Sequence, residues 1–194
     1  MDATQAVLDY FPLEELTDAQ GVRKLRGLLV AASRDTVLAN ARCAEKAGLT
    51  VVSVDLTSFA VLRALGKQSH AEVETEALID IGARVTNIVV YSAGLPRFVR
   101  ILLMGGQDIT DAIAERLGIP LGQAEAMKQQ VAYAGSSEDL AAVSRVVGAT
   151  AQDFVDEVRG SLDYYAASHP GAPVERILVS GGGSRLDGLL ERLS

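Results

Sequence analysis

Residues 76–111 of this 194-residue chain, EALIDIGARVTNIVVYSAGLPRFVRILLMGGQDITD, decide its fold. Three apolar segments, residues 77–81, 86–91 and 98–104, are separated there by turn signals such as Ser-Ala-Gly-Leu-Pro. β-branched and aromatic residues bounded by glycine and proline predict strands, and short loops between them predict hairpins. Asp80 ends the first segment, and a glycine pair follows the third. A carboxylate and glycines at strand ends indicate a place for a phosphate and its metal ion.

Upstream of this stretch, the pattern predicts a β-α-β unit. Residues 28–32 (LLVAA) predict a buried strand, residues 35–46 a helix and residues 49–54 a second strand parallel to the first. A short helix follows at 59–65. Residues 6–11 fit either an edge strand or a short helix, and the sequence leaves both open.

Downstream, helical periodicity alternates with glycine and proline breaks. Helices are expected at 108–117, 121–134, 137–147 and 150–168, the last with Phe154, Val158, Leu162 and Tyr165 as its buried stripe. A strand at 174–179 then runs into the turn Ser-Gly-Gly-Gly-Ser, and a helix starts at residue 186. Polar residues 67–75 are the expected boundary between two domains.

Composition excludes several classes of protein. The net charge is −7 and no basic run is present, which argues against a nucleic-acid partner. Cys43 is the single cysteine, so an intramolecular disulfide and a cysteine-based zinc site are excluded. The longest apolar run is too short to cross a bilayer, and the acidic N-terminal region does not resemble a signal peptide. We therefore expect a soluble cytoplasmic protein without a membrane span.

Individual motifs each admit a structural reading beside the functional one. The phosphate-binding GxxxxGK[ST] and the dinucleotide-type GxGxxG are absent. Asp80 can hold Mg²⁺ through water or cap the turn at Gly82, and Thr86 can bind a phosphate or simply pack in a strand. Glu125 and Lys128 share a helix face, as a ligand-binding pair or as a weak surface ion pair. Their order along the chain is more informative than any one of them.

That order resembles the actin-like ATPase superfamily, and within it the PilM family of type IV pilus assembly, related to the division protein FtsA. Residues 54–60 (VDLTSFA), 157–165 (EVRGSLDYY) and 177–189 (ILVSGGGSRLDGL) carry the closer likeness, which is weakest before residue 25. The resemblance implies an α/β fold: an actin-like ATPase (ribonuclease H-like) lobe with an FtsA-like side subdomain. The side subdomain would span residues 1–66, and a truncated second lobe residues 67–194.

The resemblance also implies ATP and Mg²⁺ as cofactors and assigns binding roles, with no catalytic residue. Asp80, Gly82, Ala83 and Thr86 would form the second phosphate-binding hairpin, with Asp80 near the metal ion. Gly105 and Gly106 would face the nucleotide, and Glu125 and Lys128 would contact the ribose or adenine. The adenosine turn would consist of Gly181, Gly182, Gly183 and Ser184. Arg84 departs from the pattern, because a smaller residue fits more easily beside a phosphate.

A second departure concerns the start of the chain. Members of this superfamily begin with a strand hairpin that supplies the first phosphate loop, and no glycine-hinged hairpin is expected before Leu28. We therefore expect a fragment that lacks the first phosphate-binding hairpin. Such a chain would bind ATP weakly or not at all on its own, and would be at most a slow ATPase.

The implied function is an ATP-binding cytoplasmic scaffold of type IV pilus assembly. It would dock the cytoplasmic N-terminal tail of the inner-membrane protein PilN near the side subdomain and meet other inner-membrane pilus components. These partners would hold it peripherally at the inner membrane. The alternatives are a small-molecule kinase of the same superfamily and an FtsA-like polymerising division protein.

Overall fold

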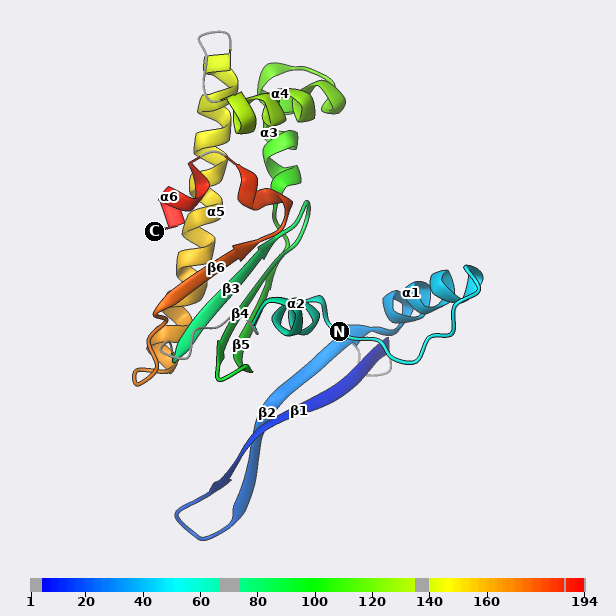
Figure 1. Ribbon diagram of the computed structural model, residues 1–194, viewed down its shortest axis with the longest axis vertical. Coiled ribbons are helices and arrows are strands. Elements are labelled where there is room, and N and C mark those ends of the chain that lie inside the picture. Colours follow the sequence, from blue (N-terminus) through cyan, green and yellow to red (C-terminus); the bar gives the residue numbers. More distant parts are fainter. Residues whose placement is uncertain (1–4, 67–73, 135–139, 187, 194) are drawn as a thin grey trace. The chain divides into compact units, whose positions relative to one another are not determined.

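The computed structural model describes residues 5–66, 74–134, 140–186 and 188–193 (Figure 1). The chain divides into two compact units, Met1–Leu56 and Thr57–Ser194. The sequence predicts the boundary after residue 66, whereas the structural division after Leu56 puts helix α2 (Thr57–Leu65) in the second unit. The assignment of the two parts to a side subdomain and a second lobe stays a prediction.

The first unit is built on an antiparallel hairpin of β1 (Ala6–Thr17) and β2 (Arg23–Ser33). The Asp18 carboxylate closes its turn by accepting the backbone N–H groups of Gln20 and Val22, at 3.0 and 2.9 Å. Gly21 supplies the positive φ of 79°. The expectation of no glycine-hinged hairpin before residue 28 is therefore wrong, because Asp18 and Gly21 together make the turn. Of the two readings of residues 6–11, the strand is the one found.

Helix α1 (Arg34–Lys46) follows the hairpin and gives way at Gly48, as predicted. The expected β-α-β unit is wrong, because residues 49–54 form no strand and β2 pairs antiparallel with β1 instead. A hairpin closes a shorter loop than a crossover does, so β2 finds its nearest partner first. The β2 strand is also not buried within the described residues, since Leu29 is 71% exposed.

The second unit contains a four-stranded sheet in the order β5-β4-β3-β6. Strands β3 (Thr75–Ile81), β4 (Thr86–Ser92) and β5 (Leu95–Leu102) are antiparallel neighbours, and β6 (Arg176–Ser180) runs parallel to β3. Ala93 and Gly94 both have positive φ, which is the two-residue turn that matches strand twist. The three strands predicted from residues 76–111 are confirmed, with the third ending two residues earlier than expected.

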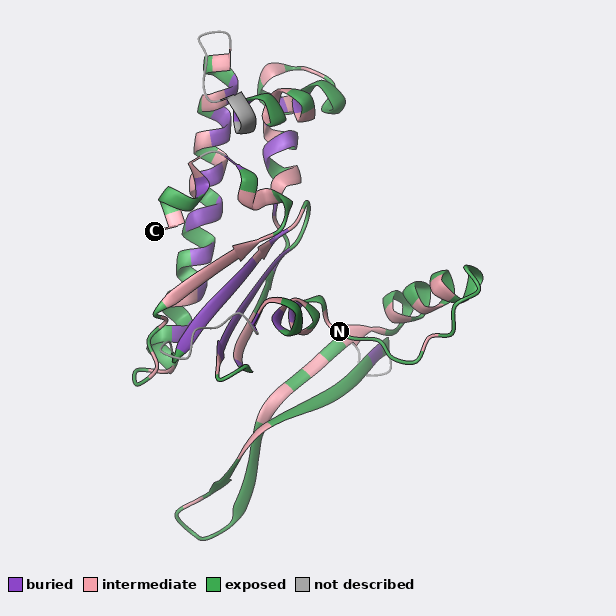
Figure 2. Cartoon of the chain, in the orientation of Figure 1, coloured by how far each residue is buried: buried purple, intermediate pink, exposed green. Residues whose placement is uncertain are grey.

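Alternation along the strands gives this sheet two apolar faces, and Figure 2 shows β3 and β4 as its most buried strands. Ile79 and Ile88 lie on the face that packs against α3 (Gly106–Leu117) and α5 (Ala141–Ser168). Leu78 and Val89 lie on the other face and pack against Leu62 of α2. The second unit therefore has separate apolar clusters on the two faces of its sheet.

The long helix α5 is one element, whereas the sequence predicted two helices separated near Gly148. The buried stripe of Val143, Val147, Ala151 and Phe154 continues in phase across that glycine. A glycine inside a helix costs about 1 kcal/mol relative to alanine, and this packing outweighs it. Ser137, the predicted cap of the first helix, lies outside the described residues. The remaining elements are α4 (Leu121–Ala134), the 3-10 helix η4 (Gly182–Arg185) and α6 (Leu189–Leu193).

A buried polar row crosses three strands on the α2 side of the sheet. Glu76 lies opposite Tyr91 on one neighbouring strand and opposite Arg176 on the other. Glu76 is 1% exposed and forms an ion pair with Arg176. Burial, together with the hydrogen bond to Glu76, raises the pKa of Tyr91 to about 12. The carboxylate is thus compensated inside the sheet rather than left as an isolated buried charge.

A helix that crosses a membrane needs about 20 consecutive, mostly apolar residues. Among the helices of the described residues, none combines enough length with enough apolar character to cross a membrane.

Candidate functional site

A cavity of about 410 Å³ lies in the second unit where three loops meet the helices. The loop after β3, the first turn of α3 and the turn after β6 each contribute to it. Helices α4, α5 and α6 supply the remaining wall, with Phe154, Leu186 and Leu189 as its larger apolar side chains. A concave site with an apolar wall and a few converging polar groups is the usual form of a small-molecule site.

Backbone hydrogen bonds fix two of the three loops to each other. The N–H groups of Gly106 and Gln107 donate to the carbonyls of Gly82 and Ala83, at 3.0 and 2.6 Å. The N–H of Gly105 donates to the Asp108 carboxylate at 2.6 Å, which caps the start of α3. The loop after β3 is therefore held directly against the first turn of α3.

Two glycines are required by close approach. A Cβ on Gly105 would collide with the carbonyl oxygens of Gly82 and Ala83. Gly181 has a φ of 87°, and a Cβ there would collide with the backbone of Ile81. Any side chain at either position would push the loops apart, so the glycines hold the rim of the cavity in shape.

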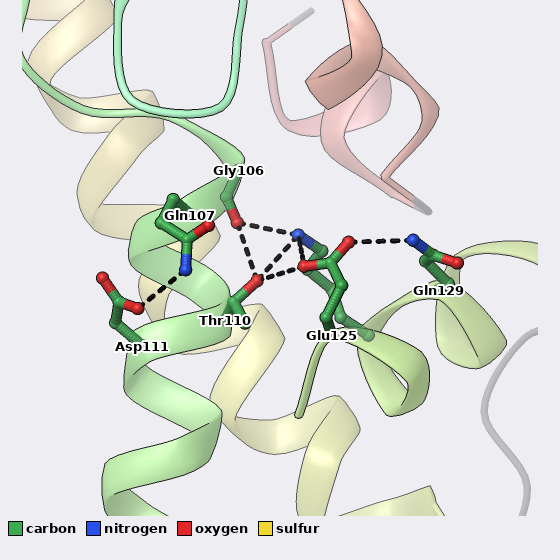
Figure 3. Close-up of polar contacts among 7 residues, drawn as sticks. Gly106, Gln107, Thr110, Asp111, Glu125 and Gln129 are labelled. Carbon is green, nitrogen blue, oxygen red and sulfur yellow. Dashed lines mark hydrogen bonds and ion pairs between the residues drawn. The ribbon is translucent and has the colours of Figure 1, made fainter. Parts of the chain in front are cut away.

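The polar side of the cavity is a hydrogen-bonded network between α3 and α4 (Figure 3). The Lys128 ammonium donates to the Gly106 carbonyl at 2.9 Å and to the Thr110 hydroxyl at 2.8 Å. It also lies 2.7 Å from Glu125 Oε2. Glu125 accepts from Thr110 at 2.5 Å and from the Gln129 amide at 2.9 Å. The network connects the helices through charge-assisted bonds, which are stronger than neutral ones.

This network keeps Glu125 ionised. Burial by itself raises the pKa of Glu125, but hydrogen bonds from Lys128, Thr110 and Gln129 outweigh it and lower the pKa to about 2. The Lys128 side chain is 15% exposed and that of Glu125 is 38% exposed. A carboxylate and an ammonium therefore stand at the cavity wall at neutral pH, suited to bind hydroxyl groups or ring nitrogens of a ligand.

The structure brings most of the site residues predicted from sequence to this one cavity. The residues that line it are Gly82, Ala83, Gly105, Gly106, Glu125, Lys128, Gly182 and Gly183. They come from segments as far apart in sequence as residues 82 and 183. Whether they bind a nucleotide stays a prediction, but their convergence was not required by the folding of the sheet alone.

The other four predicted residues do not line the cavity. Thr86 is fully buried and donates its hydroxyl to the Met104 carbonyl at 2.9 Å. Ser184 closes its own turn by donating to the Gly181 carbonyl at 2.7 Å. Asp80 accepts a hydrogen bond from Ser180 at 2.7 Å. Because neighbouring residues of a strand point to opposite faces, Asp80 lies on the α2 side and Ile81 on the cavity side.

Sequence reasoning missed several residues of the site, above all Thr110. Thr110 is four residues after Gly106 and so returns to the same face of α3 as the helix start, but that spacing alone does not distinguish it from other polar helix residues. Gln129, which follows Lys128 directly and lines the cavity, was not among the predicted residues. The other missed lining residues are Ile81, Met104, Gln107, Asp108, Ile109, Thr150, Ala151, Phe154, Arg185, Leu186 and Leu189.

Within the parts of the chain that the structure describes, no group of three or more His, Cys, Asp or Glu side chains could hold a metal ion. A magnesium ion bound with a nucleotide needs fewer protein ligands, because phosphate and water oxygens supply the rest. Asp80 does not line the cavity, so its predicted place near a metal ion stays a prediction.

Comparison with known families decides the family. The sequence profile of the family described as "Type IV pilus assembly protein PilM" matches residues 4–194. The chain belongs to this family. A chain in a solved structure titled "PilM-PilN type IV pilus biogenesis complex" is 27% identical with a TM-score of 0.80. That alignment covers 98% of this chain and 55% of the PilM-complex chain.

Two further similar proteins support an actin-like fold. The cell division protein FtsA of Bacillus subtilis is 32% identical over 142 residues, which is 67% of this chain and 32% of FtsA. The archaeal actin homolog Ta0583, solved in complex with ADP, is 16% identical with a TM-score of 0.55. It covers 87% of this chain, and this chain covers 52% of it. The chain thus spans about a third to about half the length of these relatives, and its predicted actin-like α/β fold is confirmed.

Proposed function

We propose that this chain belongs to a cytoplasmic, nucleotide-binding scaffold of type IV pilus assembly that docks the cytoplasmic tail of PilN. The observation that carries the proposal is the similarity over 98% of the chain to a structure titled a PilM-PilN complex. The PilM family match over residues 4–194 supports pilus assembly over a kinase or a division protein. Docking of PilN and other inner-membrane pilus components would hold the protein peripherally at the inner membrane.

The hairpin of the first unit offers an apolar face for this docking. Tyr10 and Leu29 are cross-strand partners, and Leu8, two residues before Tyr10, lies on the same face. They are 41%, 71% and 54% exposed, respectively. A contiguous row of exposed apolar side chains is typical of an interaction surface. We place the PilN tail on or beside this row, in the predicted side subdomain.

A peptide of the PilN cytoplasmic N-terminal tail, immobilised at low salt, tests the docking. The wild-type chain should be retained, and Leu29→Ser should weaken retention about tenfold through loss of apolar contact. Leu103→Ser is the matched control, because Leu103 is 84% exposed in the second unit. Failure of the wild-type chain to bind the peptide would refute the docking. Equal losses for the two serine variants would refute its place on the hairpin.

For the nucleotide, we propose ATP with Mg²⁺ at the cavity of the second unit. Phe154 and Leu186 offer an apolar wall for a base, and Glu125 and Lys128 offer partners for the ribose. The close approach of Gly105 to Gly82 and Ala83 leaves backbone rather than side chains at the rim, where phosphates can come near. Because Asp80 lies on the α2 side of the sheet, hydrogen-bonded to Ser180, phosphate and water oxygens rather than Asp80 would hold the metal ion at this cavity.

Titration of the nitrogen-15-labelled chain with MgADP, up to millimolar concentration, tests nucleotide binding. We expect weak, saturable changes in the amide signals of Gly105, Gly106, Gly182 and Gly183. Lys128→Met should weaken binding about tenfold, because a charged donor at the site is lost. Lys46→Met, at the end of α1 in the other unit, is the control. The absence of saturable changes would refute the nucleotide site in this chain.

We also propose that hydrolysis by this chain is slow at most. Phosphoryl transfer depends on positioned groups on both sides of the phosphates, and the described cavity supplies one set of loops. Phosphate release, measured with and without the PilN peptide, should stay far below about 1 s⁻¹. Turnover in the range of about 1–100 s⁻¹, typical of kinases, would contradict the scaffold role.

A further inference from the structure

Thr110 stands at the centre of the network between α3 and α4, although nothing in the sequence pattern marks it as a ligand. Its side chain is buried, with the residue 2% exposed. The hydroxyl lies 2.8 Å from the Lys128 ammonium, 2.5 Å from Glu125 Oε2 and 3.3 Å from the Gly106 carbonyl (Figure 3). A buried hydroxyl thus sits between the two charged groups of the cavity wall.

The chemistry of a hydroxyl fixes the direction of these bonds. A threonine hydroxyl has one hydrogen to donate and two lone pairs to accept. An ammonium can only donate, so Thr110 accepts from Lys128. A carboxylate can only accept, so the one hydrogen of Thr110 goes to Glu125 at 2.5 Å rather than to the Gly106 carbonyl at 3.3 Å. The chain of bonds therefore runs in one direction from Lys128 through Thr110 to Glu125.

We propose that Thr110 is the residue that positions Lys128 and Glu125 for ligand binding, and that a ligand hydroxyl takes the place of Gln129 on Glu125. Thr110 holds Oε2, so Oε1 is the oxygen left for a ligand, and the exposed Gln129 amide occupies it at 2.9 Å. A carboxylate accepts a hydrogen bond from a hydroxyl and repels a phosphate. The group that displaces the Gln129 amide therefore belongs to the sugar end of a nucleotide. This inference rests on the proposed nucleotide site.

The positioning role is tested first without any ligand. In Thr110→Val the shape is kept and the hydroxyl is lost, whereas Thr110→Ser keeps the hydroxyl. A carbon-13 NMR titration of the Glu125 carboxyl should show the pKa rising from about 2 toward 4.5 in the valine variant. The serine variant should stay near wild type. Thr75→Val is the matched control, because Thr75 is equally buried at the opposite end of β3.

The ligand arm uses MgADP as the probe. Thr110→Val should weaken its binding about tenfold, and Thr110→Ser and Thr75→Val by less than about twofold. Gln129→Ala should leave affinity unchanged or improve it, since the amide that competes for Glu125 is removed. Loss of affinity in Gln129→Ala would overturn the displacement step.

The two arms separate this inference from the proposed function. If the wild-type chain binds no MgADP, the nucleotide function fails, while the Glu125 titration still decides whether Thr110 positions the pair. An unchanged Glu125 pKa in Thr110→Val, or equal rises in the valine and serine variants, would overturn the role of Thr110.

Discussion

The two units of the chain use the same kind of sequence in opposite ways. Both contain antiparallel strands rich in leucine and valine, yet of described residues 5–56 only Ala6 is buried. In the second unit β3 and β4 are almost wholly buried between helices. A two-stranded hairpin has too few neighbours to cover its faces, whereas a four-stranded sheet with helices can bury both. Apolar strands therefore stabilise the second unit and leave exposed apolar surface on the first.

Cross-strand arginine–glutamate pairs should show the largest contrast. Arg176→Met removes the ion-pair partner of the buried Glu76 and should lower the free energy of unfolding by about 3 kcal/mol. Arg23→Met breaks the pair with Glu15, whose side chains are 77% and 66% exposed, and should cost less than about 0.5 kcal/mol. Urea unfolding of each variant measures the difference. Equal effects would mean that the Glu76 pair is solvated.

Leucine truncation makes the same comparison with apolar groups. Leu78→Ala, in a residue that is 1% exposed, should lower the free energy of unfolding by about 3 kcal/mol through lost burial and a cavity. Leu29→Ala, at 71% exposure, should change it by less than about 0.5 kcal/mol. The measurement is again urea unfolding, with circular dichroism to verify the fold. A large loss for Leu29→Ala would show that this side chain is covered in solution.

Glycine substitutions sharpen the comparison inside the second unit. Gly105→Ala forces a Cβ against the carbonyls of Gly82 and Ala83 and should cost about 2 kcal/mol. Gly122→Ala, in α4 with open space around its Cβ position, should stabilise by about 0.5 kcal/mol. Thermal unfolding followed at 222 nm distinguishes opposite signs readily. A neutral Gly105→Ala would mean that the two loops separate without cost.

Protonation of Glu125 at low pH should have the smallest effect on stability. The pKa of Glu125 is about 2 in the folded chain and 4.5 ordinarily, so its contribution is complete above pH 4.5 and is lost as pH falls toward 2. The side chain is 38% exposed, so solvent screening reduces the contribution to about 1 kcal/mol. Glu125→Gln should flatten this part of the stability profile. A profile unchanged by that substitution would show that other carboxylates cause the acid sensitivity.

The sequence predicted the second unit better than the first for a physical reason. In residues 76–111, the alternation of apolar segments with Gly and Pro agrees with the final packing, so local and tertiary preferences point the same way. In the first unit, residues 28–32 read as a buried strand because their composition is apolar, but composition does not state whether a partner covers them. The paired turn residues Asp18 and Gly21 were the overlooked signal for the hairpin.

The cavity residues that sequence could predict are glycines and charged residues near strand ends. Those it could not predict depend on contacts between helices that are distant in sequence. Gly82, Gly105 and Gly183 were found because each follows a strand. Thr110 and Gln129 could not be ranked from sequence, since a polar residue on a helix is ordinary until its neighbour across the interface is known. Asp80 shows the converse, because one step of strand alternation directs it away from Ile81 and the cavity.

The unbroken helix α5 connects the cavity wall with an aromatic cluster near the other end of the sheet. Phe154 on the cavity wall and Tyr165 lie on one unbroken helix, 11 residues or about 16 Å apart along its axis. The ring of Tyr165 stacks on that of His169, with 4.5 Å between the ring centroids. The Tyr165 centroid lies 5.9 Å from that of Phe98 in β5. One continuous helix therefore packs against both the cavity and the aromatic cluster at the far end of the sheet.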